Sequence, residues 1–255
     1  MLLEGKSAVI TGAGRGIGAA VARDLARHGA RVVVSARTTS EIEAVANEIG
    51  DSSKAVECDV SDPGQVSRLF EEATAFGGGV DILVNNAGIA RSAPLDKTSL
   101  DEWNRIMAIN ATGTFLCTQA FLPSMVKRGW GRVINVASTA GKAGGAYISA
   151  YAASKHAVVG FTRSMAMEVA TTGVTVNAVC PGYVDTLLVD HAVDSIIEAT
   201  GSAEDLVREH LAKSSPQNRI FDVEEVAFLV TSLCDPRAKG INGQAMVLDG
   251  GMVQS

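Results

Sequence analysis

The sequence predicts an α/β protein with a doubly wound, Rossmann-type parallel sheet of about seven strands and helices on both faces. Two observations lead to this fold. Short apolar runs rich in β-branched residues alternate with amphipathic stretches along all 255 residues, which is the pattern of successive βαβ units. The short runs are apolar at almost every position, which is typical of strands buried on both faces of a sheet.

These two patterns assign the elements in chain order. Strands are expected at residues 7–11 (SAVIT), 31–35 (RVVVS), 55–58 (AVEC), 81–85 (DILVN), 132–136 (RVINV), 174–179 (VTVNAV) and 244–248 (QAMVL). Helices are expected at residues 16–28, 40–49, 63–76 and 224–233, and longer helical patterns run near residues 101–127 and 151–171.

The alternation of strands and helices also bears on domain organisation. No linker rich in proline or serine divides the chain, so residues 1–255 are expected to form one dinucleotide-binding and catalytic domain. Residues 185–219 do not follow this alternation of strands and helices. They are polar and contain helix-like patches. An insertion of this kind in a compact α/β domain predicts a lid over the substrate.

Composition and charge exclude several classes of function. The net charge of −6 and the pI near 5.3 leave no basic face for nucleic acid or an anionic membrane. Because no apolar run is long enough to cross a bilayer and no signal-peptide pattern is present, a cytoplasmic location is expected. The four cysteines, Cys58, Cys117, Cys180 and Cys234, are far apart and predict free buried thiols and no metal site.

A glycine-rich turn separates the first strand from the first helix. Residues 12–18 read GAGRGIG, with four glycines in seven positions. Such a turn lets the backbone approach a pyrophosphate, and the helix that follows offers free N–H groups and the positive end of its dipole. The spacing Gly12-x₃-Gly16-x-Gly18 differs from the usual G-x-G-x-x-G fingerprint. Its place between a strand and a helix nevertheless predicts nucleotide binding.

The end of the second strand bears on the choice of coenzyme. NAD sites commonly place an acidic residue there to hold the ribose 2′-hydroxyl, but no acid occurs from Leu25 through Ser40. Arg37, together with Arg15 of the glycine-rich turn, would instead attract a 2′-phosphate. The residues therefore predict NADP(H) over NAD(H). The alternative is that both arginines are solvated surface charges.

Tyr151 and Lys155 form a candidate acid–base pair. They are four residues apart, which places them on one face of a helix. A neighbouring ammonium group lowers the pKa of a tyrosine, which is about 10 in the free side chain. Tyr147 has no lysine at this spacing. Ser138 follows the strand at 132–136, so its hydroxyl is expected at the same sheet edge as the glycine-rich turn.

Together these pieces resemble the short-chain dehydrogenase/reductase family over essentially the whole chain. The matching segments are TGAGRGIG (residues 11–18), NNAG (85–88), Asn110, Ser138, YAASK (151–155), PGYVDT (181–186) and LDGG (248–251). The resemblance implies that Tyr151 exchanges a proton with the substrate oxygen while Lys155 lowers its pKa and holds the nicotinamide ribose. It also implies that Ser138 orients the substrate and that Asn110 supports a water-linked proton relay.

The same resemblance implies a set of residues in contact with the coenzyme. These are Gly12, Gly14, Arg15, Gly16, Ile17, Gly18, Arg37, Thr38, Asp59, Val60, Asn86, Ala87, Gly88, Tyr151, Lys155, Pro181, Gly182, Val184 and Thr186. Within this set the resemblance places Asp59 at the adenine and Val184 and Thr186 at the carboxamide. Unusually apolar helices near residues 111–127 and 151–171 make subunit contacts in this family, so a homotetramer is expected.

Two further segments bear on the substrate. Residues 137–144 and 154–186 are similar to aromatic polyketide ketoreductases and 3-hydroxybutyrate dehydrogenases, and the 3-oxoacyl-carrier-protein reductases of the family also act on β-keto compounds. We therefore expect an oxidoreductase that interconverts a ketone and a secondary alcohol, with a 3-oxoacyl thioester of acyl carrier protein or CoA, or a related β-keto compound, as substrate. The alternatives are a secondary-alcohol, 3-hydroxybutyrate-type or sugar/polyol dehydrogenase, or a non-catalytic NADP-sensing module. An apolar substrate portion is expected to meet the lid residues Leu187, Leu188, Val189, Ile196, Ile197 and Leu206.

Overall fold

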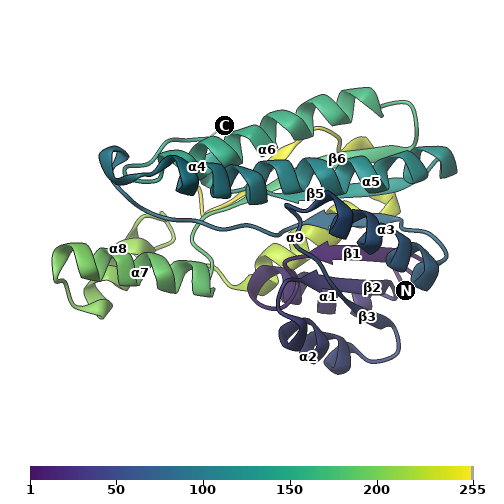
Figure 1. Cartoon of the computed structure of the whole chain (residues 1–255), viewed down its shortest axis with the longest axis horizontal. Helices are drawn as coiled ribbons and strands as arrows, with labels where there is room; N and C mark the ends of the chain where they lie inside the picture. The colour runs from purple at the N-terminus through teal and green to yellow at the C-terminus, as the bar shows by residue number, and fades with distance from the viewer. Residues whose placement is uncertain (254–255) are drawn as a thin grey trace.

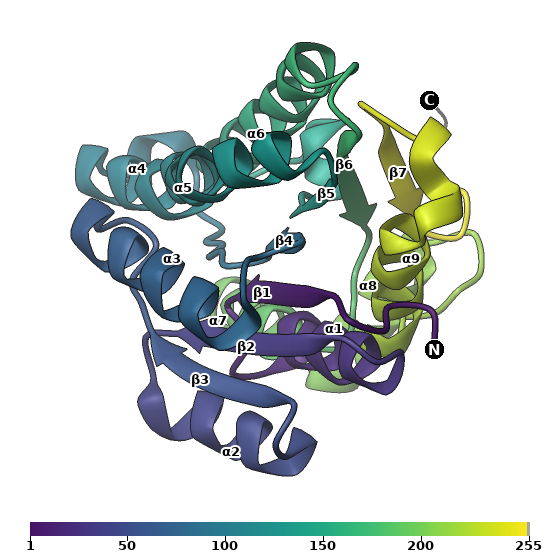
Figure 2. The same ribbon diagram turned by 90° about the vertical axis from the view of Figure 1, so that its right-hand side faces the viewer.

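The computed structural model describes residues 1–253 and has the predicted layered architecture (Figures 1 and 2). Seven parallel strands form one sheet in the order β3-β2-β1-β4-β5-β6-β7. The strand order reverses between β1 and β4. In a doubly wound sheet a ligand crevice opens beyond the carboxyl ends of the strands at this point.

All seven expected strands are present, with ends that differ by no more than two residues from the expected ones. They are β1 Ser7–Thr11, β2 Arg31–Ala36, β3 Ser53–Glu57, β4 Ile82–Asn85, β5 Gly131–Val136, β6 Val174–Pro181 and β7 Ala245–Leu248. The helices are α1 Gly16–Arg27, α2 Thr39–Ile49, α3 Pro63–Gly77, α4 Leu100–Met107, α5 Gly113–Arg128, α6 Ser149–Glu168, α7 Leu187–Thr200, α8 Glu204–Lys213 and α9 Val223–Cys234.

The sheet separates two hydrophobic cores. On β1, Ala8 and Ile10 pack into a cluster with α1, α2 and α9, whereas Val9 packs on the opposite face with residues of α3, α5 and α6. Alternate residues of a strand point to opposite faces, so a strand that is apolar throughout must be covered on both. Figure 2 shows α3, α4, α5 and α6 on one side of the sheet and α1 and α9 on the other.

The long helical pattern near residues 101–127 is interrupted in the structure. Between α4 and α5 the backbone widens into a π-helical turn, η2 Ala108–Thr112. Such turns are rare and often lie at functional sites. Here the turn carries Asn110, which is 1% exposed and therefore points into the protein.

Residues 185–219 form two helices, α7 and α8, which we call the lid helices; they extend at the lower left of Figure 1. They pack on each other through a small core of Val189, Val193, Val207 and Leu211. This core is separate from the two cores of the sheet. The lid helices therefore stabilise each other, and their polar outer faces account for the polar character of the segment.

Within residues 1–253, no helix is long and apolar enough to cross a membrane. The four cysteines are buried and free, as expected. In the same described range, no three side chains of His, Cys, Asp or Glu lie together as metal ligands would.

Candidate active site

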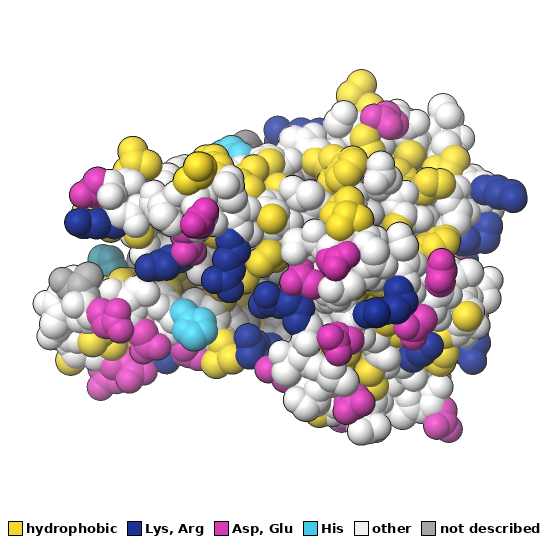
Figure 3. Space-filling view, in the orientation of Figure 1, with side chains coloured by type: hydrophobic (Ala, Val, Ile, Leu, Met, Phe, Trp, Pro, Cys, Tyr) yellow, Lys and Arg dark blue, Asp and Glu magenta, His cyan; other side chains and the backbone are white. Residues whose placement is uncertain are grey.

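A cleft of about 840 Å³ runs along the carboxyl edge of the sheet, between the strand ends and α7. Residues that follow β1 through β6 line it, so distant strand ends meet there as predicted. Figure 3 shows a hollow between the lid helices and the rest of the molecule, with basic and acidic side chains close together around it.

Most of the predicted site residues line this cleft. They are Gly12, Gly14, Arg15, Gly16, Ile17, Arg37, Thr38, Asp59, Val60, Asn86, Ala87, Gly88, Ser138, Tyr151, Lys155, Pro181, Gly182, Val184 and Thr186. Gly18 and Asn110 do not line it; both lie behind its wall, where they support other parts of the site.

The glycine-rich turn is shaped by close backbone packing. Gly12 has a φ of +65°, and a Cβ built on it would lie 2.8 Å from Ala87 Cα. A Cβ on Gly18 would lie only 2.3 Å from the Gly12 oxygen. Gly18 therefore lets α1 begin directly against β1, which explains why it supports the turn without lining the cleft.

Side chains from the end of β4 hold the turn in place. Asn86 Nδ2 donates hydrogen bonds to the backbone oxygens of Thr11 and Gly12, each at 3.0 Å. The Thr11 hydroxyl in turn accepts from the backbone N–H groups of Asn86 and Ala87, each at 3.1 Å. These bonds tie the two strands at the reversal point of the sheet, so the cleft floor is preformed.

The far end of the cleft carries both predicted arginines, but each of them faces a carboxylate. Arg15 Nη1 lies 3.0 Å from Glu41 Oε1, and Arg37 Nη1 lies 3.9 Å from Asp59 Oδ2. Partial burial of the Asp59 carboxyl opposes ionisation, but hydrogen bonds from Ser61 and the Arg37 charge lower its pKa overall. Glu41 was not among the predicted site residues, because the acid-free stretch ends one residue before it.

Tyr151 and Ser138 both line the cleft. Tyr151 lies in the first turn of α6. The Ser138 hydroxyl accepts a 3.1 Å hydrogen bond from the Ala140 N–H, which fixes its orientation. Burial raises the pKa of the Tyr151 phenol, and the nearby Ser138 side chain offsets part of this increase.

Lys155 differs from the expectation in its effect on Tyr151. Its Nζ donates a 2.8 Å hydrogen bond to the Val136 oxygen and lies 5.8 Å from the centre of the Tyr151 ring. Burial of the ammonium group lowers the pKa of Lys155 to about 8. The pKa of Tyr151 is raised by burial rather than lowered by Lys155, because Lys155 points toward the end of β5.

Asn110 joins the loop after β4 to the catalytic helix. Its Nδ2 donates to the Ile89 oxygen and to Ser154 Oγ, each at 2.9 Å, and its Oδ1 accepts from the Ile89 N–H at 2.8 Å. Ser154 Oγ in turn donates to the backbone oxygen of Tyr151 at 2.7 Å. The side chain of Asn110 thus fixes the backbone around Tyr151 without reaching the cleft.

The lid contributes fewer of the expected residues to the cleft. Leu187, Leu188 and Val189 line it, but Ile196 and Ile197 pack into the core between α7 and α8. Leu206 is 63% exposed and lies outside the cleft. The expectation for these three was wrong, because Ile196 and Ile197 pack against α8 and Leu206, which lies in α8 itself, faces solvent.

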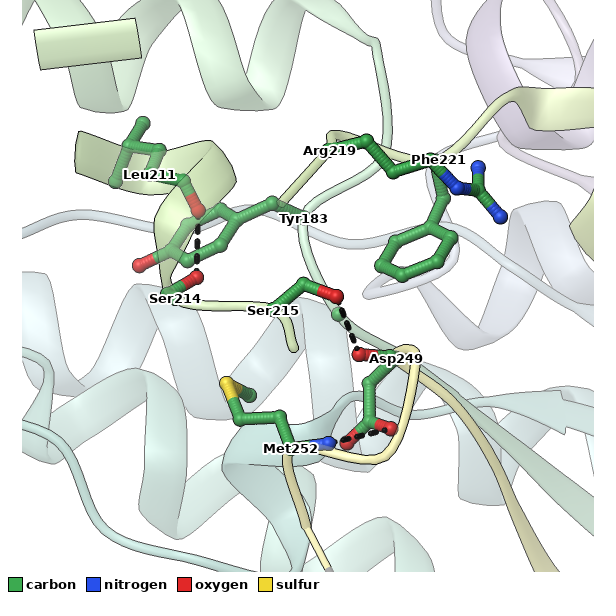
Figure 4. A pocket seen from close by; sticks show the side chains of 9 residues that line it. Tyr183, Leu211, Ser214, Ser215, Arg219, Phe221, Asp249 and Met252 are labelled. Carbon is green, nitrogen blue, oxygen red and sulfur yellow. Dashed lines mark hydrogen bonds between the residues drawn. The ribbon is translucent and has the colours of Figure 1, made fainter. Parts of the chain in front are cut away.

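The C-terminal tail forms part of the cleft wall, which the sequence did not indicate. Met252 and Val253 line the cleft, and Figure 4 shows Met252 beside Tyr183, which follows β6, and the lid residues Ser214 and Ser215. These groups pack around a crevice that leaves no room for a water molecule.

Asp249 holds the tail in this position. Its carboxylate accepts hydrogen bonds from the N–H groups of Gly251, Met252 and Val253 at 2.8, 3.2 and 2.7 Å. The Ser215 hydroxyl, which follows α8, donates to the Asp249 backbone oxygen at 2.9 Å. This arrangement connects the tail to the lid.

Comparisons with known proteins place these features in a wider context. The family model for short chain dehydrogenases matches residues 6–196. The chain is 41% identical over 252 residues to the 3-oxoacyl-[acyl-carrier-protein] reductase FabG of Vibrio cholerae serotype O1, with 99% of each chain covered. It is 38% identical over 252 residues to the D-beta-hydroxybutyrate dehydrogenase of Rhizobium meliloti, with 96% of this chain and 98% of the relative covered.

The fold is shared with a solved structure of similar length. A crystal structure of an actinorhodin polyketide ketoreductase variant with NADPH superposes with a TM-score of 0.94 at 34% identity. The superposition covers 97% of each chain.

Proposed function

Since this chain belongs to the short-chain dehydrogenase family, we propose that it is an NADP(H)-dependent oxidoreductase that interconverts a ketone and a secondary alcohol. Its best substrate is a 3-oxoacyl thioester, carried on acyl carrier protein or on CoA. The observation that carries this proposal is the placement of Tyr151 and Ser138 in the same cleft as the glycine-rich turn.

The cleft fits NADP(H) in several respects. Gly12 and Gly16 have positive φ angles and open the turn for close approach of a pyrophosphate to backbone N–H groups. Arg15 and Arg37 lie at the end of the cleft beyond β2, where the 2′-phosphate would lie. Val184 and Thr186 also line the cleft, and Thr186 lies against the turn, since a Cβ built on Gly16 would lie 3.2 Å from Thr186 Cγ2.

The residues of the chain would act on the substrate oxygen. Ser138 and Tyr151 would hold the ketone oxygen between their hydroxyl groups, and Tyr151 would donate its proton to the oxygen as reduction proceeds. Bound NADPH would supply the hydride. Lys155 would hold the nicotinamide ribose, while Asn110 would support the proton relay by fixing the loop and α6 around it.

Two named relatives support a β-oxygenated substrate. The Vibrio cholerae relative is a 3-oxoacyl-[acyl-carrier-protein] reductase, and the Rhizobium meliloti relative is a D-beta-hydroxybutyrate dehydrogenase. Both names describe an oxygen on the third carbon from the carboxyl end. The aliphatic wall of Leu187, Leu188 and Val189 favours an acyl chain over a sugar. A 3-hydroxybutyrate-type dehydrogenase is the second candidate, favoured by the 38% identity to that relative.

Subunit organisation and location belong to the same proposal. We propose one domain in which residues 185–219 act as the lid, a homotetramer, a cytoplasmic location and no nucleic-acid partner. Phe115 of α5 is 43% exposed and packs edge-on against Phe161 of α6, with ring centres 6.2 Å apart, and Met167 of α6 is 82% exposed. An apolar face of this kind favours contact with another subunit. The acidic net charge of −6 favours the absence of a nucleic-acid partner.

A substrate panel tests the reaction. NADPH absorbance would be followed with acetoacetyl-CoA, simple ketones and sugars as substrates, with NADH in parallel. The proposal expects NADPH oxidation with acetoacetyl-CoA at a higher kcat/KM than with the other compounds. Activity restricted to sugars, or no activity with any carbonyl compound, would contradict it.

A further inference from the structure

Glu41, in the first turn of α2, forms part of the cleft wall next to the glycine-rich turn. Its Oε1 lies 3.0 Å from Arg15 Nη1. A Cβ built on Gly14 would lie 2.8 Å from both Glu41 Cβ and Glu41 Oε2. The carboxylate is therefore packed against the backbone of the turn, and two-thirds of it is shielded from solvent, since its side chain is 33% exposed.

The four charged groups at this end of the cleft balance one another. Arg15 is paired with Glu41 at 3.0 Å, and Arg37 lies 3.9 Å from Asp59. The local formal charge is close to zero, whereas the arginines alone would give a strongly basic site. A phosphate monoester carries about −1.5 to −2 charges at pH 7. A balanced site attracts it less than two free arginines would.

The two carboxylates differ in how firmly they are held. Asp59 accepts hydrogen bonds from the Ser61 N–H at 2.9 Å and the Ser61 hydroxyl at 2.7 Å. These two bonds hold its carboxylate in place without Arg37. Within residues 1–253, Arg15 is the ion-pair partner found for Glu41. Arg15 must leave this pair to reach a phosphate, and its side chain is 60% exposed to solvent.

We propose that Glu41 is a coenzyme-selectivity residue that restrains the preference for NADP(H) over NAD(H), a role that rests on the proposed use of NADP(H). Glu41 holds Arg15 in an ion pair that a 2′-phosphate must break. NAD(H), which carries a 2′-hydroxyl, leaves the Arg15–Glu41 ion pair intact. Its ribose therefore lies beside a neutral pair and not beside an unpaired arginine or an unpaired glutamate. The cost of breaking the pair, together with repulsion between Glu41 and the phosphate, falls only on NADP(H).

Binding of two adenosine nucleotides to the full chain isolates this effect without turnover. Isothermal titration calorimetry would compare adenosine 2′,5′-bisphosphate with adenosine 5′-monophosphate, which lacks the 2′-phosphate. The proteins are the wild type, Glu41→Gln, and Glu43→Gln as the matched control. Glu43 lies two residues further along α2, is exposed, and has no ion-pair partner in the described part of the chain. NADPH binding to the wild type is measured alongside.

We expect Glu41→Gln to tighten binding of the 2′,5′-bisphosphate by about three- to tenfold, and to leave binding of the monophosphate within about twofold. Glu43→Gln should change neither by more than about twofold, and the effect of Glu41→Gln should shrink at high salt. In an Arg15→Ala background, most of the gain from Glu41→Gln should disappear, because the pair is already broken.

Two results would overturn the inference. Unchanged affinity for the bisphosphate in Glu41→Gln would show that the pair imposes no cost, and weaker affinity would show that Glu41 instead positions Arg15 for the phosphate. If the wild type binds NADPH while either result is found, the proposed function stands and this inference alone fails. If the wild type does not bind NADPH, both fail.

Discussion

Lys155 Nζ donates a 2.8 Å hydrogen bond to the backbone oxygen of Val136, the last residue of β5. The bond ties the catalytic helix to the strand that leads into Ser138. Lys155 is 5% exposed, and its ammonium group has one backbone oxygen as its hydrogen-bond partner within residues 1–253. Burial accordingly lowers the pKa of Lys155 to about 8 from an ordinary value of 10.5.

The buried ammonium group predicts a particular pH dependence of stability. Because the pKa is lower in the folded protein, the unfolded chain binds more protons between pH 8 and 10.5. The free energy of unfolding therefore rises with pH across this window. Relative to Lys155→Met, the wild type should gain up to about 3 kcal/mol from pH 8 to 10.5.

Urea unfolding of the coenzyme-free proteins at pH 7, 8, 9 and 10.5 measures this difference. The two curves of unfolding free energy against pH should converge or cross as pH rises. Parallel curves for wild type and Lys155→Met would mean that the folded protein does not disfavour the Lys155 charge.

Gly18 predicts a strong steric effect at the start of α1. In Gly18→Ala the new methyl group would meet the Gly12 oxygen at 2.3 Å, so the helix must move away from the turn. We expect a loss of about 1–3 kcal/mol in the free energy of unfolding and weaker NADPH binding. Gly240→Ala is the control, because a Cβ there meets nothing within 4 Å; it should change stability by less than about 0.5 kcal/mol. If Gly18→Ala and Gly240→Ala lower the free energy of unfolding equally, the close approach of Gly18 to the Gly12 oxygen is not the cause of the loss.

Asp249 predicts a link between the C-terminal tail and substrate binding. Asp249→Ala removes the acceptor of three backbone hydrogen bonds that hold Met252 and Val253 against the cleft. We expect KM for the acyl substrate to rise about three- to tenfold, while the Kd for NADPH stays within about twofold. Hydrogen exchange should show faster exchange at the tail amides.

The conservative variant separates positioning from general destabilisation. Asp249→Asn keeps one side-chain oxygen as an acceptor and should show a smaller rise in KM. If Asp249→Ala changes Kd for NADPH and KM equally, the tail would not be a specific part of the substrate wall.

The sequence predicted the sheet well because its determinants are local. The β-branched runs specify strands, and the glycine-rich turn lies between a strand and a helix, so both could be recognised without contacts. The placement of Tyr151 and Ser138 at one edge followed from the parallel strand order. The family assignment is confirmed by the match over residues 6–196.

Features that depend on contacts between distant segments were not predicted. The Arg15–Glu41 pair joins the glycine-rich turn to α2, and an acid-free stretch in the sequence could not reveal it. The inward turn of Ile196 depends on α8, and the tail reaches the cleft through Ser215. The raised pKa of Tyr151 reflects burial, which the four-residue spacing from Lys155 does not indicate.

The reaction itself is tested most directly by the turnover of Tyr151→Phe with NADPH and acetoacetyl-CoA. Tyr147→Phe is the matched control, since Tyr147 is 64% exposed and lies outside the cleft lining. Loss of the phenolic proton donor should lower kcat by at least about 100-fold, with Kd for NADPH within about twofold, whereas Tyr147→Phe should retain wild-type turnover. Near-wild-type kcat in Tyr151→Phe would contradict the assignment of Tyr151 as the acid–base group.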